Sequence, residues 1–134
     1  MPFPPEAIDA AIRSAVPRGA GFGGQCAAFA VVLNRVLGGG GTYLCADGQH
    51  YEYVEHVALL VDGEIYDASG RISRERLAEY ADPPDGEEPE IIEVDDESVR
   101  GMVDPTGGGL SAPLDESSIE TRLRRALPGP SPAP

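Results

Sequence analysis

The sequence contains no lysine and no tryptophan, and only two cysteines and two histidines among its 134 residues. Without lysine, no phosphate-binding loop of the Gly-x-x-x-x-Gly-Lys type can exist. Without tryptophan, no indole ring can anchor the core or line a cleft. No apolar run approaches the ~20 residues that a membrane-spanning helix needs, and residues 1–5 do not resemble a secretory signal. We therefore expect a cytoplasmic protein that does not bind membranes.

Basic residues are also scarce: ten stand against 23 acidic residues, which gives a net charge of −13. This balance argues against binding of DNA or RNA through the phosphates, and against anionic lipid surfaces. An acidic surface would suit a basic protein or peptide substrate, although solubility alone is the simpler explanation. All ten basic residues are arginine, and a composition rich in Ala, Gly and Pro is typical of GC-rich bacterial or phage coding sequences.

The length predicts one domain, which we place at residues 1–127, followed by a flexible proline-rich tail at 128–134. We expect an α+β fold, in which a central helix packs on a small antiparallel sheet of about four strands. An Asp47-Gly48 turn predicts a hairpin between the first two strands, and an Asp62-Gly63 turn predicts another. The predicted helices are 6–15, 25–37, 73–80 and 115–127, and the predicted strands are 42–46, 49–54 continuing into 56–61, 64–67 and 90–94.

Cys26 is predicted to lie in the first turn of the helix at 25–37, directly after a glycine-rich turn. Unpaired backbone N–H groups and the helix dipole stabilise a thiolate at such a position, so we expect a lowered pKa for Cys26. The same amides would face a developing oxyanion. Gly24 would let a substrate approach the backbone, and Gln25 would either cap the helix or donate to the oxyanion. The alternative is a cysteine that packs in the core like an alanine.

His56 and Asp67 are predicted to meet across the second hairpin. A two-residue turn at 62–63 would place Ala58 opposite Asp67, and His56 would then share the face of Asp67. An aspartate so placed can hold one imidazole nitrogen while the other faces Cys26. A slip of one residue would send Asp67 to the other face. The alternative is an exposed polar pair at a strand edge.

Other combinations of these residue types are weaker. His50 has the same strand parity as His56 and is the second-choice base. A zinc site would need Cys26, Cys45, His50 and His56, but no Cys-x-x-Cys or comparable spacing supports it, so we expect no metal and no cofactor. The two cysteines could form one disulfide, yet a chain without an export signal is expected to be reduced, with Cys45 as a structural thiol.

Two segments carry a resemblance to a known superfamily: Gly24-Gln25-Cys26-Ala27-Ala28-Phe29-Ala30, and the run from His56 through Asp67 to Ala68. They resemble the core of papain-like cysteine enzymes in their compact bacterial and phage forms, and most closely the transglutaminase-like branch with its Cys, His and Asp order. The resemblance covers roughly residues 20–80. It implies Cys26 as nucleophile, His56 as general base and Asp67 as the acid that orients the histidine.

Some features of that superfamily are missing. No tryptophan follows Cys26 or His56, as it does in many relatives. Cys26 also lacks the preceding Asp and the following Ser-Gly that mark the cell-wall peptidases of the superfamily, and the third polar residue is Asp67 rather than their usual His. The reaction therefore stays open among peptidases, amidases, deamidases and cross-linking enzymes.

These observations predict a cysteine-dependent acyl-transfer enzyme, a thiol hydrolase of amide or peptide bonds or a transglutaminase-like enzyme. It would act through a thioester on a Cys26-His56-Asp67 triad, with Gly24 and Gln25 beside the oxyanion. Two alternatives belong to other classes. One is a non-catalytic binding or accessory domain with the same fold, which a phage could encode. The other is a toxin-like effector domain that modifies a host protein.

Overall fold

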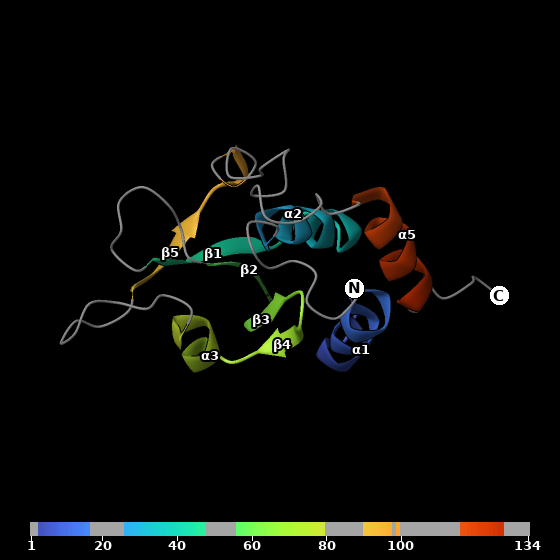
Figure 1. The fold of residues 1–134 in the computed structure, drawn as a ribbon, viewed down its shortest axis with the longest axis horizontal. Coiled ribbons are helices and arrows are strands. Elements are labelled where there is room, and N and C mark those ends of the chain that lie inside the picture. The colour runs from blue at the N-terminus through green and yellow to red at the C-terminus, as the bar shows by residue number, and fades with distance from the viewer. Residues whose placement is uncertain are drawn as a thin grey trace, which may run out of the picture.

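The computed structural model describes residues 3–16, 26–47, 56–79, 90–97, 99 and 116–127, which form four α-helices and five β-strands (Figure 1). The helices are α1 (Pro5–Ala15), α2 (Cys26–Val36), α3 (Arg74–Glu79) and α5 (Glu116–Ala126). The strands are β1 (Thr42–Asp47), β2 (His56–Val61), β3 (Glu64–Asp67), β4 (Gly70–Ile72) and β5 (Glu90–Val94). None of the helices in this part of the chain is long and apolar enough to cross a membrane.

The strands form one antiparallel sheet in the order β4-β3-β2-β1-β5. This confirms the α+β class, the antiparallel sheet and the position of β5 at an edge. The sheet has five strands rather than about four, because β4 was not foreseen. A strand of three residues is too short to show an alternating pattern, so the sequence between β3 and α3 offered no strand signal.

The first two strands pair antiparallel as predicted, but Ala46 lies opposite His56, which is not the register that a two-residue turn at 47–48 would give. Both edges of β1 are occupied by other strands, since Cys45 pairs with Val57 of β2 on one side and with Ile92 of β5 on the other. The Asp-Gly turn signal is local, whereas the second partner of β1, β5, is distant in the chain. Residues 48–55 lie outside the described part of the chain.

Helices cover the two faces of the sheet unequally. On one face α2 packs against β2, and α5 contacts both α1 and α2. Alternate residues of β1 separate the two cores: Tyr43 and Cys45 join the cluster under α2, while Leu44 joins the smaller cluster under Leu77 of α3. Nine residues of α2 are buried, and eight of these nine are apolar. This confirms α2 as the buried central helix.

The remaining buried residue of α2 is polar and fixes how the chain leaves the helix. Asn34 is 7% exposed; its Oδ1 accepts a hydrogen bond from the Gly41 amide at 2.9 Å, and its Nδ2 donates to Tyr43 Oη at 3.1 Å. These bonds satisfy a polar side chain that would otherwise be costly to bury. They tie the end of α2 to the start of β1, so the helix that carries Cys26 is held against the sheet that carries His56.

Candidate active site

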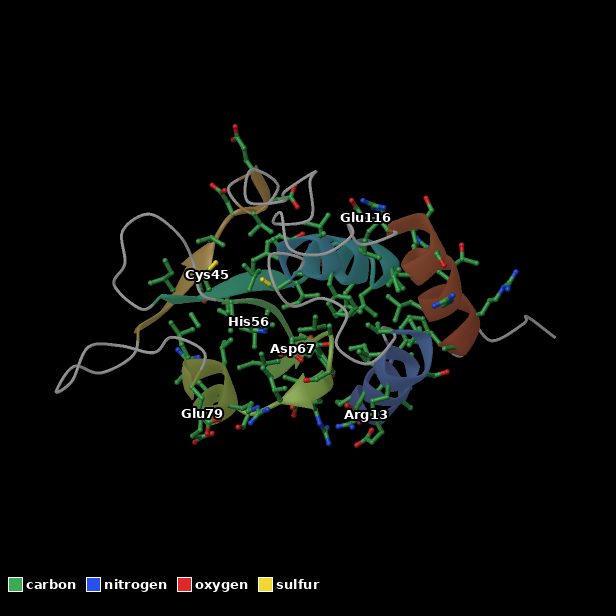
Figure 2. The ribbon with its side chains drawn as sticks, in the orientation of Figure 1. Arg13, Cys45, His56, Asp67, Glu79 and Glu116 are labelled. Atoms are coloured by element: carbon green, nitrogen blue, oxygen red, sulfur yellow. The ribbon has the colours of Figure 1, made fainter. Side chains whose placement is uncertain are left out.

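His56 and Asp67 form a buried hydrogen-bonded pair. His56 Nε2 lies 3.0 Å from Asp67 Oδ2, and the side chains are only 3% and 1% exposed. Figure 2 shows the two side chains close together below α2. The β2–β3 register pairs Val61 with Glu64, as a two-residue turn at 62–63 requires, which confirms the predicted register and places both side chains on one side of the hairpin. Asp62, with φ of 50°, and Gly63, with φ of 82°, supply the left-handed backbone of that turn.

Cys26 completes the group from another element. It is the first residue of α2, and its side chain is a hydrogen-bond partner of His56. Because Asp67 occupies Nε2, the nitrogen left for Cys26 is Nδ1. Cys26 is only partly buried, whereas His56 and Asp67 are buried. Cys26 is thus the most exposed of the three residues.

The environment of His56 favours its charged form. Burial lowers the pKa of His56, but the hydrogen bonds to Asp67 and Cys26 and the negative charges of these two groups outweigh it and raise the pKa from 6.5 to about 9. At neutral pH the ring therefore carries two N–H groups. One donates to the Asp67 carboxylate, which leaves the other for Cys26.

Asp67 has a further partner that we did not predict. Asp67 Oδ1 accepts hydrogen bonds from the Ser69 amide at 2.8 Å and from Ser69 Oγ at 2.5 Å. Burial raises the pKa of Asp67, but the bonds from His56 and Ser69 outweigh it and hold this pKa below its ordinary value. An Asp followed two residues later by Ser is a signal for a local side-chain turn, and it could have identified Ser69.

The turn that carries Ser69 is anchored by α1. Asp67 pairs with Gly70 across the β3–β4 hairpin, and Asp9 Oδ1 accepts a hydrogen bond from the Arg71 amide at 2.7 Å. Gly70 has φ of 119°, and a Cβ there would lie 2.3 Å from Asp9 Oδ1. Only glycine fits this position without strain, so backbone geometry and close packing both fix the turn beside Asp67.

The structure thus brings together Cys26, His56 and Asp67. Gly24, Gln25 and His50 lie outside the described residues. Cys26 and Cys45 are not joined in a disulfide, and Cys45 is fully buried on β1. Within the described ranges, no group of three or more His, Cys, Asp or Glu side chains could hold a metal ion.

A cleft of about 530 Å³ lies elsewhere, between the end of α2 and the β1–β5 edge. Asn34, Arg35, Tyr43, Asp95 and Asp96 contribute its polar lining. None of the three residues of the candidate site lines it. Among its described lining residues the cleft holds no nucleophile beside a base, whereas Cys26, His56 and Asp67 combine a thiol, an imidazole and a buried carboxylate, which makes them the candidate active site.

Comparisons with models of protein families, with curated proteins and with solved structures find no match for this chain. The function must therefore be argued from the geometry of the site itself.

Proposed function

We propose that the protein is a cysteine-dependent acyl-transfer enzyme with Cys26 as nucleophile, His56 as proton carrier and Asp67 as the residue that orients His56. The observation that carries this proposal is the buried 3.0 Å contact between His56 and Asp67, joined to a partly exposed thiol at the start of α2. A nucleophile, a base in contact with it and a third group that holds the base are the parts that covalent catalysis requires.

The first half-reaction forms a thioester. The Cys26 thiolate, paired with the His56 imidazolium, attacks an amide or ester carbonyl carbon, and the carbonyl oxygen becomes an oxyanion. Backbone N–H groups in the first turn of α2 donate to this oxyanion. The intermediate then collapses: the bond to the leaving nitrogen or oxygen breaks, and His56 Nδ1–H supplies the proton that the leaving group needs.

The second half-reaction releases the acyl group. His56, now neutral, takes a proton from water, whose oxygen attacks the thioester carbonyl. The C–S bond breaks, the acid departs, and the thiolate–imidazolium pair is restored. An amine in place of water would give transfer rather than hydrolysis. We favour hydrolysis because water is the default acceptor, and a protein or peptide as the substrate; the acidic surface would suit one with basic side chains.

This proposal includes the resemblance to papain-like and transglutaminase-like enzymes as a hypothesis about the fold. The described strands and helices are compatible with such a core: a helix beginning at a cysteine, a strand beginning at a histidine, and a neighbouring strand ending in an aspartate. A non-catalytic binding domain and a toxin-like effector are the predicted alternatives. The partly exposed thiol in contact with His56 favours the enzyme over a non-catalytic domain.

The test is acylation by p-nitrophenyl acetate, followed by nitrophenolate release and by intact-protein mass spectrometry. We expect an initial burst and an acetyl group on Cys26. Cys26→Ala should abolish both, and His56→Ala should slow acylation by about 100-fold or more. Cys45→Ala is the matched control, since it removes the other, fully buried thiol. A burst that survives Cys26→Ala, or equal acylation in the His56→Ala protein, would rule out the proposed mechanism.

A further inference from the structure

Three hydrogen bonds from protein groups hold the carboxylate of Asp67. Its Oδ2 is taken by His56 Nε2, and its Oδ1 by the amide and hydroxyl of Ser69. The residue is 1% exposed, so bulk water has almost no access to it. A buried carboxylate depends strongly on such bonds, because each lost partner leaves charge that solvent cannot compensate. Among the described residues, Ser69 is the group that holds the far oxygen of Asp67.

We propose that Ser69 is a fourth residue of the site, a positioning residue that keeps the Asp67 carboxylate ionised and oriented toward His56. This inference rests on the proposed function. With Oδ1 held by two donors, the carboxylate cannot rotate about its Cβ–Cγ bond without losing both. Oδ2 then stays directed at Nε2, which keeps Nδ1–H directed at Cys26. The hydroxyl contributes a charge-assisted bond, the stronger kind of hydrogen bond.

The position of Ser69 separates this role from a packing role. Ser69 is exposed and lies in the two-residue loop between β3 and β4, while Asp67 beside it is buried. Truncation to alanine would remove one hydroxyl from the surface and would leave the Ser69 amide bonded to Asp67. The anchoring of the loop through Asp9 and Gly70 would also be unchanged. The variant therefore isolates the hydroxyl.

The experiment compares Ser69→Ala and Ser69→Thr with wild type by two measurements. The first is the NMR titration of the His56 ring, identified by comparison with a His50→Gln protein. The second is the rate of Cys26 alkylation by iodoacetamide from pH 5.5 to 9.5, a range that includes the His56 pKa of about 9. For Ser69→Ala we expect the His56 midpoint to fall by about one pH unit and alkylation at pH 7 to slow by about tenfold, the equivalent of one charge-assisted hydrogen bond.

Ser69→Thr keeps the hydroxyl and should restore both values. Ser73→Ala is the matched control, because Ser73 Oγ also makes one local hydrogen bond: it accepts from the Arg76 amide at 3.0 Å, at the start of α3. It should lower the melting temperature without moving the His56 titration. If Ser69→Ala leaves both measurements at the wild-type values, or if Ser73→Ala changes them equally, the assignment of Ser69 is wrong.

The two proposals fail in different ways. If wild-type alkylation does not depend on His56, the proposed acyl-transfer function fails. The His56 titration still decides whether the Ser69 hydroxyl acts on the Asp67–His56 pair, since it needs no turnover. If alkylation depends on His56 but neither measurement responds to Ser69→Ala, the proposed function stands and only the role of Ser69 is overturned.

Discussion

The raised pKa of His56 predicts how stability should depend on pH. In the unfolded chain the His56 pKa returns to about 6.5, so the native state binds the proton more tightly. The stabilisation is fully present below pH 6.5 and is lost as the pH rises through about 9. A rise from 6.5 to about 9 corresponds to about 3 kcal/mol of unfolding free energy, at about 1.4 kcal/mol per pH unit. An exposed ion pair contributes only about 0–1 kcal/mol to the free energy of unfolding, so an effect of this size requires a buried pair.

The measurement is urea unfolding at several pH values from 6 to 9.5, in the Cys26→Ser protein with and without Asp67→Asn. Replacing the thiol removes the ionisation of Cys26 from the pH dependence of unfolding. The protein retains the Asp67 hydrogen bond, which is the largest of the contributions that raise the His56 pKa. The Asp67-containing protein lacks the contributions of Cys26 to the His56 pKa, so it should lose only part of the ~3 kcal/mol between pH 6.5 and 9. The Asp67→Asn protein should lose much less, because burial alone lowers the His56 pKa.

All other titrating groups are common to both proteins, so the difference between the two curves reports the His56–Asp67 pair. Parallel curves would refute the reasoning, since they would mean that Asp67 does not raise the affinity of His56 for its proton.

Three further predictions concern the framework that holds the site, each measured by urea unfolding. Gly41→Ala should lower the free energy of unfolding by about 1–3 kcal/mol, because a Cβ would lie 2.7 Å from Leu59 Cδ1. Gly40→Ala should be near neutral, because a Cβ there would meet no atom within 4 Å. Equal effects of the two substitutions would contradict the packing argument. Leu77→Ala should cost about 2–5 kcal/mol, because Leu77 is fully buried under the second face of the sheet. Ser73→Ala should cost about 1 kcal/mol through the loss of the α3 cap, and a larger loss would indicate a role beyond capping.

The candidate site could be predicted from sequence where the signals were local and periodic. A glycine-rich segment before an apolar helix located Cys26 at the start of α2, and the two-residue Asp62-Gly63 turn determined the register that brings His56 to Asp67. Both inferences depend on local backbone geometry.

What could not be predicted depends on contacts distant in sequence. β1 pairs with the distant β5, and with β2 in a register that places Ala46 opposite His56, neither of which the local Asp-Gly signal at 47–48 indicates. The anchoring of the β3–β4 turn by Asp9 joins residues that are 62 positions apart. No periodicity in the sequence indicates such a pairing, and the role of Ser69 followed only once the orientation of the Asp67 carboxylate was known.

The most direct test of the central claim is the rate of Cys26 alkylation by iodoacetamide at pH 6.5, in wild type and in His56→Ala, with the modified cysteine identified by peptide mass spectrometry. The account predicts rapid modification of Cys26 in wild type, well below the pH of about 8.5 at which a free cysteine becomes half ionised, and a large loss of rate without His56. Slow modification of Cys26 that is indifferent to His56 would contradict the account, and would leave the buried His56–Asp67 pair as a structural feature of the fold.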